Sequence, residues 1–166
     1  MLTKNFYALM RMAFGKIKST VISDGNITKT VEFPSGSNWY GVFPAMCKYK
    51  NTSSYQWVSF GSGTTPATVN DYKLESEITT GISVTSQDSP TTEHTDKYTL
   101  WTATFGVKAS VETTISEIGL FSHVYTSSGS FITLVDRTVL DTPITIPAGQ
   151  SKQITYTIRF NYGDAV

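Results

Sequence analysis

The stretch Gln153-Ile-Thr-Tyr-Thr-Ile-Arg-Phe160 alternates polar and apolar side chains without interruption. Successive side chains of a β-strand point to opposite faces, so a period of two places one row against a core and the other row in solvent. The threonines of the polar row suit a half-solvated pleated surface, because they are β-branched. This segment therefore predicts a strand with one buried face. Its apolar row is Ile154, Tyr156, Ile158 and Phe160, and its polar row is Gln153, Thr155, Thr157 and Arg159.

Further strand-like segments precede this one along the chain. They are separated by turn residues, and no convincing helical pattern follows the first fifteen residues. Asp24-Gly25-Asn26 is a strong hairpin signal, because glycine and asparagine tolerate positive φ. Many short strands between turns predict an all-β fold, an antiparallel β-sandwich of jelly-roll-like type. The predicted segments are residues 16–23, 27–33, 39–43, 55–60, 78–84, 98–107, 115–121 and 131–135.

The apolar rows of the strands predict the core, and two polar segments predict long loops. The loops are Gly61–Asn70, rich in glycine, threonine and proline, and Gln87–Lys97, rich in charges. Gly119 interrupts an apolar strand pattern, so a bulge or a close approach of another group is expected there. The predicted core residues are Trp101, Phe105, Ile115, Leu120, Ile132, Leu134, Ile154, Tyr156 and Ile158.

Residues 1–15 differ from the rest and predict a short amphipathic helix or arm, followed by a sandwich domain over residues 16–166. Apolar residues recur there at three- and four-residue spacing. A helix this short is marginal alone in water, so its apolar stripe must be buried on another surface. One destination is the end of its own sandwich. We expect the other, a neighbouring subunit, for residues 1–14. The stripe comprises Leu2, Phe6, Leu9, Met10 and Ala13.

Composition excludes some classes of protein. The 166 residues carry 13 Lys and Arg and 13 Asp and Glu, a formal net charge of zero. A protein that coats nucleic acid by neutralising phosphates would be basic, so we predict no such role. Charged residues are 16% of the chain, against roughly 25% in ordinary domains, and serine and threonine make up about a quarter. A surface with hydroxyls in place of charges repels its neighbours weakly, which suits an assembly.

Targeting signals are weak in this sequence. No apolar run is long enough to cross a bilayer. Arg11 interrupts the apolar N-terminal stretch before it reaches the length of a secretory signal, and no cleavage site of small residues follows. We therefore expect synthesis in the cytoplasm without an export signal, and no membrane span.

Residues able to carry catalysis do not form a recognisable pattern. Cys47 is the sole cysteine, so neither an intrachain disulfide nor a cysteine-based zinc site is possible. His94 and His123 are the only histidines, and no Gly-x-Ser-x-Gly nucleophile turn is present. Gly61-Ser-Gly-Thr-Thr lacks the lysine of a phosphate-binding loop. We predict that the protein is not an enzyme and needs no cofactor.

Two binding hypotheses remain as alternatives. Asp88, Glu93, His94 and Asp96 could offer oxygen ligands to Ca²⁺, but their spacing lacks the alternating ligands and the glycine of a calcium loop. We expect a solvated loop there, without an obligatory metal. Aromatic side chains could instead stack on sugars in a carbohydrate- or receptor-binding module. These aromatics are Trp39, Tyr40, Tyr55 and Trp57.

Three segments resemble small virion structural proteins of tailed bacteriophages, and they occur in the same order. Phe60-Gly-Ser-Gly-Thr-Thr-Pro-Ala-Thr-Val-Asn-Asp-Tyr-Lys-Leu-Glu75 is similar to a G-x-G-T-T-P-P-T-x-x-D-Y-x-L stretch of that family. Ile115-Ser-Glu-Ile-Gly-Leu-Phe121 resembles its I-S-E-I-G-L strand. Leu140-Asp-Thr-Pro-Ile-Thr-Ile-Pro-Ala-Gly-Gln150, leading into the last strand, resembles its C-terminal ending. Together the segments cover about a third of the chain.

The resemblance implies a non-enzymatic building block of the virion, set in several copies in the tail, neck, collar or fibre-attachment region. Its partners would be copies of itself and other virion structural proteins, without sequence-specific binding of nucleic acid. A capsid decoration or head-fibre protein is the nearest alternative, and the carbohydrate- or receptor-binding module is the more distant one. The candidate interface residues are Leu2, Phe6, Leu9, Met10, Thr64, Thr65, Pro66, Asp71 and Tyr72.

Overall fold

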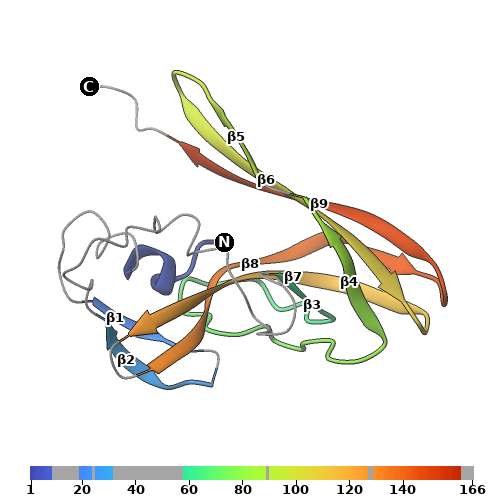
Figure 1. The fold of residues 1–166 in the computed structure, drawn as a ribbon, viewed down its shortest axis with the longest axis horizontal. Coiled ribbons are helices and arrows are strands. Elements are labelled where there is room, and N and C mark those ends of the chain that lie inside the picture. Colours follow the sequence, from blue (N-terminus) through green and yellow to red (C-terminus); the bar gives the residue numbers. More distant parts are fainter. Residues whose placement is uncertain (9–18, 24, 32–57, 89, 127–128, 162–166) are drawn as a thin grey trace. The chain divides into compact units, whose positions relative to one another are not determined.

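A computed structural model describes residues 1–8, 19–23, 25–31, 58–88, 90–126 and 129–161 (Figure 1). Residues 4–8 form a short helix, and the remaining regular structure of these residues is β-strand. Every strand pair with a defined register is antiparallel. The prediction of an all-β, antiparallel fold of the sandwich class with a short N-terminal helix is therefore confirmed. The strands are β1 Ser19–Ile22, β2 Thr28–Val31, β3 Val58–Gly61, β4 Ile82–Gln87, β5 Thr91–His94, β6 Tyr98–Ala109, β7 Thr113–Thr126, β8 Gly129–Ile146 and β9 Ser151–Asn161.

The chain divides into two compact units. The first comprises Met1–Ile78 and Ile115–Ile144, and the second comprises Thr79–Thr114 and Thr145–Val166. Strand β7 begins in the second unit and strand β8 ends in it, but most residues of both strands belong to the first unit. The boundary predicted after residue 15 lies outside the described residues and stays a prediction.

The first unit contains the β1–β2 hairpin and a sheet with strand order β3-β7-β8. The hairpin predicted around residues 24–26 is confirmed, and Asn26 adopts a φ of 59° in its turn. Leu74, Phe121 and Leu134 form a buried cluster. A Cβ atom on Gly119 would lie only 2.8 Å from Cδ2 of Leu74, so the predicted close approach at this glycine is confirmed.

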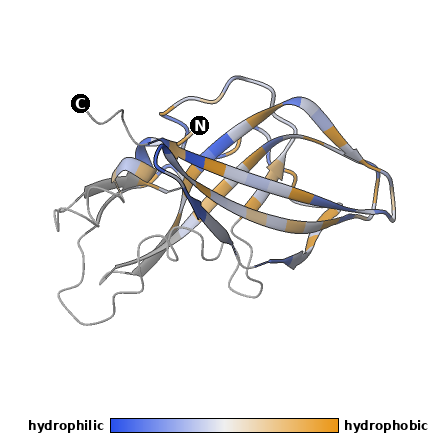
Figure 2. Ribbon diagram, turned by 90° about the horizontal axis from the view of Figure 1, so that it is seen from above, coloured by the Kyte–Doolittle hydropathy of each residue, from blue (hydrophilic) through white to orange (hydrophobic). Residues whose placement is uncertain are grey.

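The second unit is organised around β6. Strand β9 pairs with β6 along one edge, and β4 and β5 pair with different parts of its other edge. Buried residues alternate with more exposed ones along most of β9 and along β6 from Leu100 to Phe105, and Figure 2 shows the hydropathy of each residue along the strands. Directly paired residues such as Phe105 and Ile154 share the buried face.

The predicted core is confirmed. Seven of the nine predicted residues are buried, and Ile132 and Ile158 are half-buried. The seven buried residues are Trp101, Phe105, Ile115, Leu120, Leu134, Ile154 and Tyr156.

The prediction of an uninterrupted loop at Gln87–Lys97 is wrong, because this segment contains β5. A tight turn closes the β5–β6 hairpin, in which the amide and hydroxyl of Thr95 both donate to the carbonyl of Tyr98. All four residues of β5 are exposed and polar, so their sequence shows no apolar row. The predicted strand at residues 39–43 lies outside the described residues, as do Cys47, Trp39, Tyr40, Tyr55 and Trp57.

Candidate interaction site around Arg137

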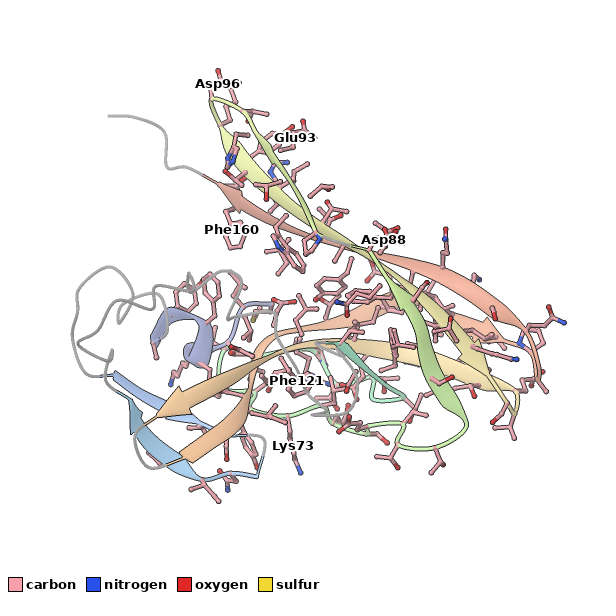
Figure 3. The ribbon with its side chains drawn as sticks, viewed as in Figure 1. Lys73, Asp88, Glu93, Asp96, Phe121 and Phe160 are labelled. Atoms are coloured by element: carbon pink, nitrogen blue, oxygen red, sulfur yellow. The ribbon has the colours of Figure 1, made fainter. Side chains whose placement is uncertain are left out.

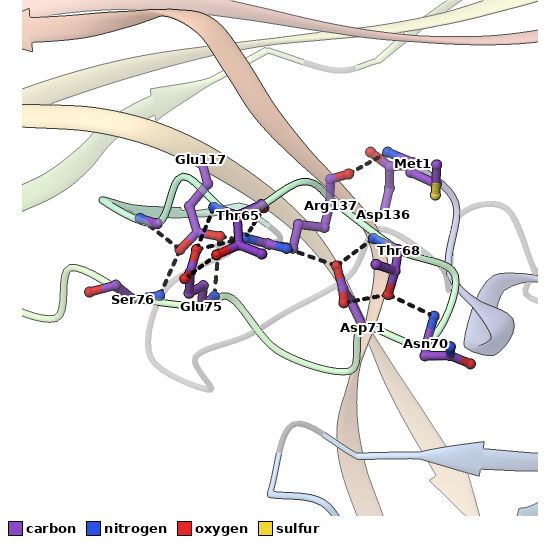
Figure 4. Close-up of polar contacts among 11 residues, drawn as sticks. Met1, Thr65, Thr68, Asn70, Asp71, Glu75, Ser76, Glu117, Asp136 and Arg137 are labelled. Atoms are coloured by element: carbon purple, nitrogen blue, oxygen red, sulfur yellow. Dashed lines mark hydrogen bonds and ion pairs between the residues drawn. The ribbon is translucent and has the colours of Figure 1, made fainter.

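The buried side chain of Arg137 is the centre of a polar network in the first unit (Figure 4). It comes from β8 and is only 4% exposed. Its Nε donates to Oε2 of Glu117 at 2.7 Å, and its Nη1 donates to Oδ2 of Asp71 at 2.9 Å. Its Nη2 donates to the carbonyl of Thr65 at 3.1 Å and to Oε2 of Glu75 at 3.3 Å. We call these five residues the arginine clamp.

Glu117 joins the clamp to strand β7 and is fully buried. Besides Arg137, its carboxylate accepts backbone N–H bonds from Gly63 at 3.2 Å, from Glu75 at 3.1 Å and from Ser76 at 2.8 Å. A buried carboxylate is costly unless it is paired and hydrogen-bonded, and Glu117 is both. A Cβ atom on Gly63 would lie 2.7 Å from Oε1 of Glu117, so the backbone reaches this carboxylate only as glycine.

The segment held by the clamp is residues 62–76, which we call the clamp loop. Within it, Glu75 accepts from the amide of Thr65 at 2.8 Å and from its hydroxyl at 2.6 Å. Asp71 accepts in the same way from the amide and hydroxyl of Thr68, at 2.9 and 2.8 Å. Threonine and aspartate favour such side-chain-to-backbone bonds in irregular segments. The carboxylates therefore fold the loop locally and also attach it to Arg137.

The network favours the ionised form of each group whose pKa it shifts. Hydrogen bonds from Thr65 lower the pKa of Glu75. Burial by itself would raise the pKa of Asp71, but hydrogen bonds from Thr68 and Arg137 lower it below its usual value. Burial would likewise lower the pKa of Arg137, whereas its bonds to Asp71 and Glu117 raise it. The shifts of Asp71, Glu75 and Arg137 thus all favour the charged form of these three side chains.

The hydrogen bonds of Arg137 fix the position of the clamp loop relative to β7 and β8. A guanidinium is planar and presents its donors in a rigid fork, so bonds to several groups fix their relative directions. Here the fork of Arg137 joins the clamp loop to Glu117 on β7 from its own place on β8. Outside the network, Thr64, Pro66 and Val69 of the same loop are exposed to solvent. A loop held rigidly from inside with an exposed outer surface is suited to contact a partner.

The predicted interface residues of this loop are brought together, although in different roles. Thr65 and Asp71 belong to the clamp, whereas Thr64 and Pro66 lie outside it; Thr64, Thr65 and Pro66 are all exposed. Tyr72 is half-buried, and the Nζ of Lys73 lies 6.0 Å from the centre of its ring. Leu74, near the end of the clamp loop, is buried at 3% exposure.

The first residues of the chain lie against strand β8 of their own unit. Leu2 forms an isolated antiparallel bridge with Asp136, and the amide of Thr3 donates to the carbonyl of Val135 at 3.0 Å. The α-ammonium of Met1 is 3.1 Å from Oδ1 of Asp136. Phe6 is buried at 5% exposure. These contacts resemble the addition of a short strand to β8.

Two further contacts connect the short helix to other parts of the first unit. The amide of Lys4 donates to the carbonyl of Val69 in the clamp loop at 2.8 Å. The side chain of Asn5 exchanges two hydrogen bonds of 2.7 Å with the backbone of Ile22. For residues 1–8 the structure thus favours the alternative to a neighbouring subunit, which is burial on their own chain. Leu9 and Met10 lie outside the described residues, and the contact with a neighbouring subunit stays a prediction.

Glu75, Glu117 and Arg137 are the three clamp residues that the sequence analysis did not predict, and the last two lie within strands. Glu117 is the one Asp, Glu, Lys or Arg residue of β7, and Arg137 follows Asp136 in the middle of β8. Charged residues are rarely fully buried unless paired, so an isolated charge in a core strand signals a partner nearby. That signal could have suggested the pair, but the participation of Asp71 and Glu75 depends on how the loop folds.

The residues that could offer ligands to Ca²⁺ are spread from the end of β4 to the turn of the β5–β6 hairpin. Figure 3 shows Asp88, Glu93 and Asp96 at separate positions there. His94 is exposed, and its Nδ1 lies 2.9 Å from the hydroxyl of Thr99. Across the described part of the chain, no three His, Cys, Asp or Glu side chains gather in a way that could hold a metal ion. The side chain of His123 is not among those described.

Comparison with known proteins adds no relative. No protein-family model matches this chain, and no curated protein or solved structure matches it either. Within the residues that the structure describes, no helix is long and apolar enough to cross a membrane.

Proposed function

We propose that this protein is a non-enzymatic structural component of a tailed-bacteriophage virion, present in several copies and acting through protein–protein contacts. Its place would be the tail, the neck or collar, or the region where fibres attach. The proposal begins from the three ordered segments that resemble such proteins, at residues 60–75, 115–121 and 140–150.

The observation that carries the proposal is the meeting of two of these segments at Arg137. The first segment supplies Thr65, Asp71 and Glu75, and the second supplies Glu117. The residues that carry the resemblance thus include those that fix the clamp loop in one conformation. A contact surface needs such support, because a loop that is ordered before binding loses less conformational entropy on association.

Exposed apolar side chains occur on the clamp loop and on the N-terminal residues that contact it. Val69 is 42% exposed, and it lies next to the short N-terminal helix because its carbonyl accepts from Lys4. Met1 and Tyr7 are also strongly exposed, at 54% and 56%. Exposed apolar groups close to one another mark protein contacts more often than isolated ones do. We therefore assign the contact surface to the clamp loop and the adjoining residues 1–8.

Tailed particles purified from cells that express this chain provide the test. Quantitative mass spectrometry of purified tailed particles should find the chain at a fixed ratio to the other virion proteins. Labelling with antibodies against the purified chain should then mark one part of the particle. Tailed particles that assemble fully without the chain would contradict the proposal.

A pair of matched variants tests the contact surface itself. Val69 and Val111 are both exposed valines, at 42% and 58%, and Val111 lies outside the clamp loop. Val69→Asp should reduce incorporation into particles at least about tenfold, because a charge buried in a contact is costly. Val111→Asp should be incorporated normally. Equal incorporation of both variants would exclude the clamp loop as the contact surface.

A further inference from the structure

Strand β9 has one edge to which no other strand pairs among the described residues. Its eleven residues, Ser151–Asn161, pair with Lys108–Tyr98 of β6 along the opposite edge. An unpaired strand edge presents a row of N–H and C=O groups that can pair with another chain. The sequence of β9 determines which strand can pair with this edge.

The hydrogen bonds at the start of β9 define which of its backbone groups face outward. The amide of Ala109 donates to the carbonyl of Gln150 at 3.0 Å, so Ala109 and Gln150 face each other. In an antiparallel ladder, every second residue points its backbone groups to the same partner. The backbone N–H and C=O groups of residues 152, 154, 156, 158 and 160 therefore point toward β6. The outward N–H and C=O groups belong to Ser151, Gln153, Thr155, Thr157, Arg159 and Asn161.

This edge lacks two of the features by which proteins commonly block extra strand pairing, although it carries the exposed charges Lys152 and Arg159. Prolines and bulges are two such features. Strand β9 contains no proline, and its register with β6 runs through all eleven residues without a shift. By contrast, β4 has a register irregularity between Val84 and Ser86, and β8 contains Pro143. The backbone of β9 is therefore regular enough to take up another strand along its whole length.

We propose that β9 pairs antiparallel with β9 of a second copy of this chain, about a two-fold axis through Tyr156. Only this register pairs the whole strand, because Ser151 and Asn161 are equally distant from Tyr156 in sequence. It also matches the outward backbone groups, since Thr155 then faces Thr157 of the second copy. This inference goes beyond the proposed function and is independent of it, because it concerns contact between identical chains in solution.

The solvent-facing side chains are compatible with that register. Thr155 and Thr157 already form hydroxyl pairs with β6, at 3.3 Å to Thr104 and 3.1 Å to Thr102. Pairing of Thr155 with Thr157 of the second copy continues this row of threonines across the two-fold axis. Threonine–threonine pairs directly opposite each other stabilise antiparallel strands.

This register also places no two like charges of the paired β9 strands opposite each other. Arg159 lies opposite Gln153 of the second copy, and Lys152 lies opposite Phe160. Like charges directly opposite each other would be destabilising, and no such pair arises. On the other face, Ile154 lies opposite Ile158 of the second copy, so the apolar row continues as well.

Sedimentation equilibrium of the purified chain tests the pairing. We expect a dimer of about twice the chain mass of 18.3 kDa. Thr157→Pro should give a monomer, because proline removes an outward N–H while an edge strand tolerates its ring. Thr157→Val keeps the N–H and the β-branched shape, and this control should remain dimeric. A wild-type chain that stays monomeric at its highest soluble concentration would overturn the proposal.

Cysteine cross-linking tests the register without a proline that could disturb folding. In a Cys47→Ser background, a chain with Thr155→Cys mixed with one carrying Thr157→Cys should form a disulfide-linked pair under mild oxidation. Either chain alone, or Gln153→Cys mixed with Thr157→Cys, places the cysteines out of register and should cross-link at least about fivefold more slowly, because disulfides need Cα atoms within about 7 Å. Equal rates in all mixtures would show that the contact is not this one.

Discussion

The clamp loop and the β6–β9 pair are stabilised by opposite means. The clamp loop is an irregular segment held by one buried guanidinium and by carboxylates that accept backbone N–H bonds. The β6–β9 pair is a continuous ladder with an apolar row on one face and threonines on the other. The comparison teaches that buried charge pairs fix the conformation of an irregular segment, whereas a regular ladder is held by burial of one face and by backbone pairing.

The largest effect is expected when Arg137 is replaced by methionine, which leaves Glu117 buried without its cation. Breaking a buried pair in this way costs about 3–5 kcal/mol of unfolding free energy. Arg159→Met is the matched control, because Arg159 is exposed and lies 4.0 Å from the ring centre of Tyr98. That substitution should cost about 1 kcal/mol or less. Denaturant unfolding of both variants checks the difference, and equal losses would contradict the role of the clamp.

Removal of a core side chain from the β6–β9 pair should have a similar effect by another mechanism. Phe105→Ala removes a fully buried ring, which costs about 3–5 kcal/mol. Thr104→Ala, on the opposite face of the same strand, should cost less than about 1 kcal/mol. Thermal unfolding measures both changes. A small loss from Phe105→Ala would mean that the alternation in β6 does not mark a core.

An added methyl group at Gly119 should have an intermediate effect. The new Cβ would lie 2.8 Å from Leu74 Cδ2 and 3.0 Å from Leu134 Cδ1, and overpacking of this kind costs about 1–3 kcal/mol. Because Leu74 anchors the end of the clamp loop, the variant should also increase proteolysis between residues 62 and 76. Gly149→Ala is less suitable as a control, since Gly149 has a φ of 77°. Gly25→Ala serves better, because its nearest neighbour would be Ser23 Oγ at 3.7 Å.

The smallest effect is a dependence on acid pH. The pKa values of Asp71 and Glu75 are lowered in the folded chain, so the unfolded state binds more protons as the pH falls. The contribution of these groups to stability is present above their unfolded pKa values, near 4, and is lost as the pH falls through the lower folded values. Asp71→Asn should therefore show a shallower loss of unfolding free energy below pH 4 than the wild type. Parallel pH profiles would argue against ionised Asp71 as a support of the loop.

The two regions also differ in how far their structure could be predicted. Gln153–Phe160 and Tyr98–Val107 were predictable because burial of one face leaves a period of two in the sequence. Strand β5 was missed because its four residues are all exposed and polar, and its strand pairing within the described ranges is with β6. The clamp was missed because Arg137 and Asp71 are 66 residues apart, and only the folded loop brings them together. A charge in a strand predicts that a partner exists, but its identity depends on tertiary structure.

Hydrogen exchange of Arg137→Lys tests most directly whether the clamp fixes the loop. Lysine keeps the charge but loses the planar fork, so bonds to several groups at once are no longer possible. The account predicts that amides in residues 63–76 exchange at least about tenfold faster, which corresponds to about 1.4 kcal/mol of local opening free energy. Amides of β6 and β9 should exchange at the wild-type rate. Unchanged exchange in the clamp loop, or equal acceleration in both regions, would contradict the account.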